Sequence, residues 1–196
     1  TLVLIAGTLL LSALVVVPAV FVVVYRFGRL ARATNVLVLM PFAMPPVVAS
    51  VGLLQIYAED PLPIVGTPWI LLGCYFTVVL PFIYRAVSDR LHALALHDLM
   101  DAAHLAGASS LQAFWWVVLP NSAKALLASA FVSFSVLLGE FVFANMLTGT
   151  QFETLQIYLY SVRQTSGHFT SAIVMSYFFI TLALTWLALW LTRQKD

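Results

Sequence analysis

The residues most capable of metal chemistry in this sequence lie in one polar segment, where two histidines flank an aspartate. His97, Asp101 and His104 fall four and then three positions apart, which places them on one face of a helix. Two imidazoles and a carboxylate could hold a transition metal, with water completing the shell. Spacing alone is weak evidence, however, and a solvated polar face accounts for the same residues. We therefore predict no metal ligands here.

Glu140 is the one acidic residue that lies well inside an apolar stretch. An ionisable side chain in a membrane span is costly and by default faces the bundle interior or a cavity. Two interpretations stay open: Glu140 lines a translocation path and meets a cationic solute, or it makes a structural hydrogen bond or ion pair. Ser133 and Asn145 are further candidates for a polar path. No histidine lies near the middle of a span, so we predict no catalytic residues.

The elements that must position these residues are membrane helices. The chain has 196 residues, of which 62% are hydrophobic and 9% charged, and its mean hydropathy is +1.01. A soluble domain of this size does not need so much apolar surface, so the surrounding solvent is a bilayer. The net charge of +1 gives no case for nucleic-acid binding. A span needs about 20 mainly apolar residues, and we predict five spans, at 2–25, 36–57, 69–84, 123–147 and 169–191.

Prolines interrupt the second and third spans. Pro41, Pro45 and Pro46 each remove a backbone donor from the span at 36–57. Broken helices are tolerated at membrane depth only where protein or a water-filled cavity satisfies the freed backbone groups. We expect a kinked entry turn at 41–46 rather than a direct role in a path. Pro81 interrupts the third span, and a long polar insertion is expected to follow at 85–122.

Basic residues predict the orientation of these spans. One side of the predicted membrane carries nearly all of them, and only Arg163 falls on the other: Arg26, Arg29, Arg32, Arg85, Arg90, Lys124, Arg193 and Lys195. This asymmetry places the first loop, the polar insertion and the C-terminus in the cytoplasm. Five spans then put Thr1 outside, and we expect further residues before Thr1.

The polar insertion carries a recurrent pattern between residues 101 and 120. Asp101-Ala102-Ala103 is followed by Gly107, and Val117 is followed by Leu119-Pro120. Alanine and leucine favour helix from 91 to 113, and Gly107 is more naturally a helix end than a helix interior. Trp115 and Trp116 are expected at the membrane interface, and Leu119-Pro120 is expected to stop the element. A helix on the lipid surface would bury little with such small side chains, so docking to a cytoplasmic partner fits better.

This pattern resembles the EAA loop of permease subunits of ATP-binding-cassette importers, with Asp101 for the usual Glu and Val117 for the usual Ile. The resemblance implies an all-α polytopic membrane protein of the inner membrane, six-spanning in full. It implies one permease domain over 1–196, with a cytoplasmic coupling loop at about 86–122. The implied coupling residues are Asp101, Ala102, Ala103, Gly107, Ala108, Leu119 and Pro120.

The C-terminal half is similar to permeases of the spermidine/putrescine branch, through Gly139-Glu140-Phe141, Thr148-Gly149 and the stretch from Thr154 to Tyr160. The resemblance implies a polyamine or an aminoalkylphosphonate as the solute, delivered by a periplasmic binding protein. It implies a second permease subunit, identical or homologous, and partner ATPase subunits that hold ATP and Mg²⁺. This chain has no Gly-rich phosphate loop, so no cofactor is expected on it. The alternative is an ion-gradient-driven transporter or channel that uses Glu140.

Overall fold

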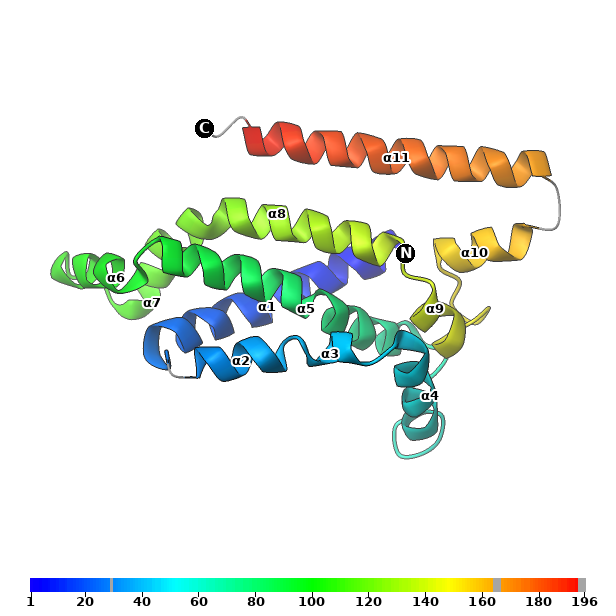
Figure 1. Cartoon of the computed structure of the whole chain (residues 1–196), viewed down its shortest axis with the longest axis horizontal. Coiled ribbons are helices and arrows are strands. Elements are labelled where there is room, and N and C mark those ends of the chain that lie inside the picture. The colour runs from blue at the N-terminus through cyan, green and yellow to red at the C-terminus, as the bar shows by residue number, and fades with distance from the viewer. Residues whose placement is uncertain (29, 164–166, 194–196) are drawn as a thin grey trace.

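The computed structural model describes residues 1–28, 30–163 and 167–193, and over these ranges it contains helices and no strand (Figure 1). Arg29 and Lys195, which entered the predicted orientation, lie outside these residues. The helices are α1 (Leu2–Arg26), α2 (Ala31–Leu37), α3 (Met40–Ala43), α4 (Pro46–Tyr57), α5 (Pro68–Ala93), α6 (Leu96–Leu105), α7 (Ser110–Ala113), the π-helical η1 (Phe114–Val118), α8 (Leu119–Leu138), α9 (Val142–Leu147), α10 (Leu155–Val162) and α11 (Gly167–Arg193). The all-α class is as predicted.

The core of the fold lies where α1, α5 and α8 pack together (Figure 1). Half of the apolar stretch of α5 is buried (50%), against 39% in α1 and 28% in the helix from Ser110 to Leu138. Ile5 and Val20 of α1 meet Leu71, Tyr75 and Val79 of α5 in this core, all fully or nearly fully buried. The helix α5 is therefore the central element of the bundle.

Three helices are long and apolar enough to cross a membrane: α1, α5 and the continuous run from Ser110 to Leu138, counted over the described residues. A fourth candidate is the bent pair Ala33–Ala43 and Pro46–Tyr57. The predicted fifth span coincides with α11, where the described apolar stretch is Thr170–Ala183. The helix α11 follows α10 and lies along α8 (Figure 1). The count of five spans stays a prediction.

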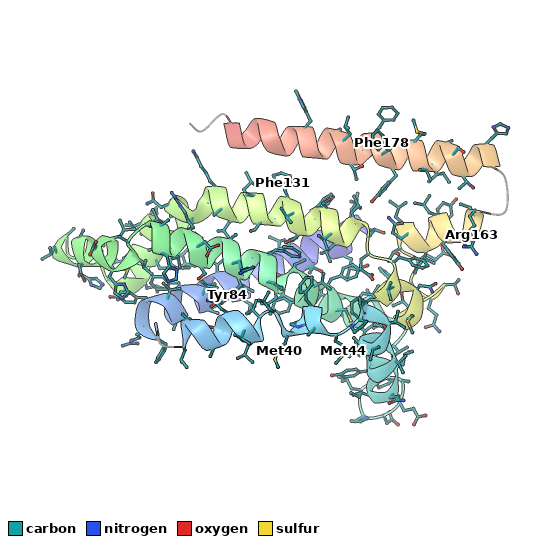
Figure 2. The ribbon with its side chains drawn as sticks, viewed as in Figure 1. Met40, Met44, Tyr84, Phe131, Arg163 and Phe178 are labelled. Carbon is teal, nitrogen blue, oxygen red and sulfur yellow. The ribbon has the colours of Figure 1, made fainter. Side chains whose placement is uncertain are left out.

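The predicted second span is broken, as its prolines suggested, and the break is sharp. The two arms meet at 89°. Met44 is extended (φ −104°, ψ 124°) because the following proline disfavours helical backbone, and Pro46 then opens α4 at a position that needs no donor. Large apolar side chains stay exposed along this segment, Met40 among them (Figure 2). Such a surface requires lipid or protein around it.

The helices differ from the predicted third and fourth spans. The expected third span, 69–84, is only part of α5, which continues through Pro81 to Ala93. Pro81 is buried among packed neighbours, and tertiary packing here outweighs the helix-breaking tendency of proline. The expected fourth span, 123–147, is divided: α8 ends at Leu138, and the separate helix α9 begins at Val142. The segment between the predicted fourth and fifth spans contains a further helix, α10.

Candidate functional site

The segment from 94 to 120, which carries the pattern and is called the motif segment, lies at one end of the bundle, opposite α4 and α9 (Figure 1). Its helix α6 buries Leu96 and Met100 at 2% and 0% exposure, against α5 and η1. The opposite face presents Asp101 and Ala102, and Leu105 there is 91% exposed. The outward face of α6 thus carries small and polar side chains and one large apolar side chain, Leu105.

The start of α6 is held in an uncommon backbone conformation. Ala95, its N-cap, has φ 47° and ψ 59°, the only positive φ of a residue other than glycine in the described chain. Left-handed backbone costs an L-residue roughly 1–2 kcal/mol. This conformation turns the chain out of α5 and sets the direction of α6. No sequence signal pointed to Ala95, because alanine gives no hint of left-handed backbone.

The end of α6 is the turn that Gly107 predicted. The N–H of Gly107 donates to the carbonyl oxygen of His104 (2.9 Å), and the N–H of Ala108 donates to that of Ala103 (3.0 Å). Gly107 itself has φ 87°. This pair of bonds around a left-handed glycine is the Schellman ending of a helix. Both ends of α6 are thus set by left-handed residues.

The chain returns to the bundle through a capping box and a π-helical turn. The Ser109 hydroxyl accepts from the N–H of Gln112 (3.3 Å), and the Gln112 side chain accepts from the N–H of Ser109 (2.8 Å). Phe114 of η1 then packs on Phe21 of α1, with ring centroids 4.9 Å apart. Trp115 and Trp116 are exposed, at 52% and 81%. The motif segment is therefore anchored to α1 directly after its exposed helix.

Leu119-Pro120 does not stop the helix, contrary to expectation. The helical path runs on into α8, with Pro120 in its first turn. A proline ring inside a regular α-helix clashes with the carbonyl four residues earlier, here that of Trp116. Trp116 lies in the wider π turn, which relieves that clash. The side chain of Asn121 donates to the carbonyl oxygen of Val117 (2.8 Å) and so satisfies an acceptor in the same turn.

The side chains of His97, Asp101 and His104 do not form a cluster that could bind a metal ion. His104 Nε2 lies 3.2 Å from the Ser110 hydroxyl, and the His97 ring lies 5.6 Å from the ring of Tyr25. Over the described residues there is no group of three or more His, Cys, Asp or Glu that could hold a metal ion. His104 thus makes a local contact with the start of α7, and His97 makes a ring contact with Tyr25 of α1.

Glu140 lies in the break between α8 and α9. Its Oε1 accepts from the N–H of Phe143 (2.7 Å) and its Oε2 from the N–H of Ala144 (3.2 Å), so the carboxylate caps the start of α9. Tyr75 of α5 is fully buried, and within the described part of the chain its hydroxyl has no hydrogen-bond partner. The side chain is half-buried. In this conformation both oxygens of Glu140 are engaged.

Gln156 is a polar residue of this region that sequence reasoning did not single out. Its Nε2 donates to the carbonyl oxygen of Leu138, the last residue of α8 (3.0 Å). Leu138 has no continuing helix to donate to that oxygen, because α8 stops there. The signal was present only as one letter in the stretch from Thr154 to Tyr160. Its role depends on a break that the sequence did not reveal.

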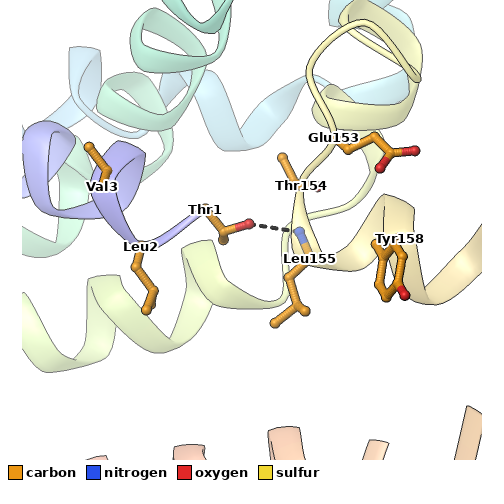
Figure 3. Close-up of a pocket in the computed structure, with 7 residues that line it drawn as sticks. All are labelled: Thr1, Leu2, Val3, Glu153, Thr154, Leu155 and Tyr158. Carbon is orange, nitrogen blue, oxygen red and sulfur yellow. Dashed lines mark hydrogen bonds between the residues drawn. The ribbon is translucent and has the colours of Figure 1, made fainter. Parts of the chain in front are cut away.

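The other two path candidates differ in their surroundings. Ser133 is fully buried in α8, and among the residues that the structure describes its hydroxyl has no hydrogen-bond partner, whereas Asn145 is exposed on α9. A pocket between the start of α1 and the start of α10 contains neither of them, nor Glu140 (Figure 3). There the Thr1 hydroxyl accepts from the N–H of Leu155 (2.7 Å). The three candidates are thus not brought together in that pocket.

These features define a multi-pass, all-α membrane protein that presents a short helix at one end of its bundle. The chain belongs to the family described as the binding-protein-dependent transport system inner membrane component, which residues 3–195 match. Its members are transport permease subunits, not enzymes.

Curated relatives are permeases of several transport systems. The chain is 35% identical over 112 residues to the probable sulfate transport system permease protein cysT of Prototheca wickerhamii, covering 52% of this chain and 44% of that protein. It is 28% identical over 123 residues to the putative 2-aminoethylphosphonate transport system permease protein PhnV of Salmonella typhimurium, covering 63% and 46%. It is 25% identical over 176 residues to the spermidine/putrescine transport system permease protein PotC of Haemophilus influenzae, covering 88% and 66%. The chain thus spans about half the length of the first two of these relatives.

Proposed function

We propose that this chain is a permease subunit of an ATP-binding-cassette importer and that α6 is the helix through which partner ATPase subunits act on it. The observation that carries the proposal is the presentation of α6. Its apolar residues Leu96 and Met100 are buried in the bundle, while the motif residues Asp101 and Ala102 face outward. The family membership supports the same role.

The geometry suits a helix that transmits force. A docked helix moves the bundle only if it is joined stiffly to it, and α6 is joined at both ends. Ala95 links it to α5, the central helix, and the turn at Gly107 leads through Ser109 to Phe114, which packs on α1. ATP and Mg²⁺ stay on the partner, and closure of two ATPases moves α5 and α8 through α6.

The remaining partners and the orientation follow from the same proposal. The end of the bundle with α6 faces the cytoplasm of a bacterial cell, and the end with α4 and α9 faces outward, where a periplasmic binding protein delivers solute. A second permease subunit, identical or homologous, covers the exposed apolar side chains of the bent second span, which include Val36, Met40, Phe42 and Val48.

The solute that we propose is a polyamine or an aminoalkylphosphonate. Similarity to a spermidine/putrescine permease and to a 2-aminoethylphosphonate permease supports an aminated solute, while similarity to a sulfate permease supports an anion. Ser133 and Asn145 are proposed as path residues on α8 and α9. Glu140 is included with these path residues because its carboxylate caps α9, the helix that carries Asn145.

Affinity purification from detergent tests the proposal. The native chain is compared with Gly107→Asp plus Asp101→Lys, and with a matched control of equal charge change at the other end, Thr150→Asp plus Glu153→Lys. We expect an ATPase subunit with an ATP-binding cassette to copurify with the native chain and the control, and to be lost from the first variant. Retention by that variant, or no ATPase with any of them, would overturn the proposal and favour ion-driven transport that uses Glu140.

A further inference from the structure

The break between α8 and α9 leaves backbone groups that must find partners. The carbonyl oxygen of Leu138 ends α8 without a helical donor, and the N–H groups of Phe143 and Ala144 begin α9 without helical acceptors. In a bilayer, water is not available to satisfy such groups, and each unsatisfied one costs several kcal/mol. The break can persist only if side chains supply the missing partners.

Two side chains supply them from opposite sides. Glu140 accepts from Phe143 and Ala144 at 2.7 and 3.2 Å, and Gln156, which belongs to α10, donates to Leu138 at 3.0 Å. The negative carboxylate also lies at the positive end of a helix, where it is favoured. Side chains thus satisfy backbone groups on both helices at the break, the end of α8 through Gln156 and the start of α9 through Glu140.

The position of α9 matters for the whole outer end of the bundle. The helix contacts both α4 and α5, and the carbonyl oxygen of Leu147, its last residue, accepts from the N–H of Gly66 (2.8 Å) in the segment before α5. Contacts that hold the start of α9 in place therefore also determine how α9 packs against α4, the second arm of the bent span.

From these contacts we propose that Glu140 and Gln156 form a polar clamp. The clamp holds the end of α8 and the start of α9 in position and so keeps α9 packed on α4 and α5. In this clamp Glu140 is a positioning residue, because its two carboxylate oxygens accept from the N–H groups that begin α9. The proposal does not rest on the importer function, because it concerns only how this chain satisfies its own backbone.

Cys74 provides a native reporter of the clamp. It is the only cysteine of the chain, it is 7% exposed, and it precedes Tyr75 on α5. It lies on α5, which contacts α9. Opening of α9 should therefore raise its reactivity toward a small neutral thiol reagent. Methyl methanethiosulfonate applied to the membrane-embedded protein measures this, with Cys74→Ser as the blank.

The variants distinguish the loss of hydrogen bonds to the backbone from the loss of the negative charge of Glu140. Glu140→Ala and Gln156→Ala are each expected to raise the labelling rate of Cys74 by about tenfold, the effect of losing one or two buried hydrogen bonds. Glu140→Gln keeps one acceptor oxygen for Phe143 and is expected to raise the rate less than Glu140→Ala. Glu153→Ala, which removes an exposed carboxylate at the same end of the bundle, is expected to leave the rate unchanged.

The clamp is overturned if folded Glu140→Ala and Gln156→Ala proteins label at the native rate. It is equally overturned if Glu140→Gln labels as fast as Glu140→Ala, because a charge alone would then be what matters. Should Glu140→Ala fail to fold, as judged by gel filtration, Gln156→Ala decides, since it removes a single bond to α8 and leaves the cap of α9 in place.

Discussion

The side-chain Nε of Arg90 donates to the backbone carbonyl oxygen of Asn121 at 3.0 Å, across 31 positions of sequence. The bond joins the end of α5 to the start of α8, and the segment that holds α6 leaves and re-enters the bundle between these two residues. The bond therefore ties α5 to α8 at the base of the segment that holds α6.

Loss of this bond should loosen the motif segment. Arg90→Ala removes a charged donor from a backbone acceptor, and because the bond is exposed the free energy of unfolding is expected to fall by about 0.5–1.5 kcal/mol. Limited proteolysis in detergent micelles should show faster cleavage between residues 94 and 112. Arg85→Ala, which removes an exposed arginine five positions earlier, is the control and should leave the cleavage rate unchanged. Equal cleavage of the native chain and Arg90→Ala would contradict this role of the bond.

Glycine at position 95 should stabilise the protein. Ala95 is held at φ 47°, where an L-residue is strained and glycine is not. We expect Ala95→Gly to raise the midpoint of thermal unfolding, with a gain of about 1 kcal/mol offset in part by the greater flexibility of unfolded glycine. The same change at Ala93, the last residue of helical α5, should instead lower the midpoint. A lower midpoint for Ala95→Gly would argue against the left-handed turn.

Substitution of Gly107 should lower stability only through the backbone conformation at that position. Nothing lies within 4 Å of the position that a Cβ would take there, so steric contact contributes little to the effect of Gly107→Ala. The left-handed φ of 87° is the remaining cost, and we expect a loss of about 1 kcal/mol. Gly107→Asn should lose less, because asparagine tolerates this conformation.

Gly73→Ala is the control for Gly107→Ala. Gly73 lies within helix α5 with equally open space around it, so alanine should be neutral or stabilising there. Thermal unfolding of the three variants in one detergent gives the comparison. Equal loss at positions 73 and 107 would mean that the turn is not left-handed in solution.

The π turn should depend on Pro120. Deletion of Trp116 removes the extra residue of the π segment and returns 110–138 to regular α-helix, in which the proline ring meets a carbonyl oxygen. We expect the deletion to lower the thermal midpoint, and Pro120→Ala in the same chain to restore much of it. No recovery on adding Pro120→Ala would show that the π turn has another cause.

Much of the motif segment was predictable because its signals are local. Gly107 followed by Ala108-Ser109 marks a helix end through backbone preference alone, and Pro45-Pro46 marks a break through the loss of donors. The apolar stretches and the family resemblance were equally visible. These features depend on residues adjacent in the chain.

What was missed depends on contacts between distant residues. The division of the fourth span at Gly139 follows from Glu140 capping α9 and from Gln156, 18 positions beyond Leu138, reaching its carbonyl oxygen. The passage of α5 through Pro81 depends on the helices packed around it, and the left-handed Ala95 on the placing of α6. Such tertiary contacts have no periodic signature in the sequence.

Cross-linking from the exposed face of α6 tests most directly whether this helix docks onto an ATPase. A cysteine placed at Ala102 in a Cys74→Ser background carries a photoactivated cross-linker, and Thr150→Cys in the same background serves as the control at the opposite end. From position 102 we predict an adduct whose partner peptides include the nucleotide-binding motifs of an ATP-binding-cassette ATPase. From position 150 we predict no such adduct. An ATPase captured equally from both positions, or only from position 150, would contradict the coupling role of α6.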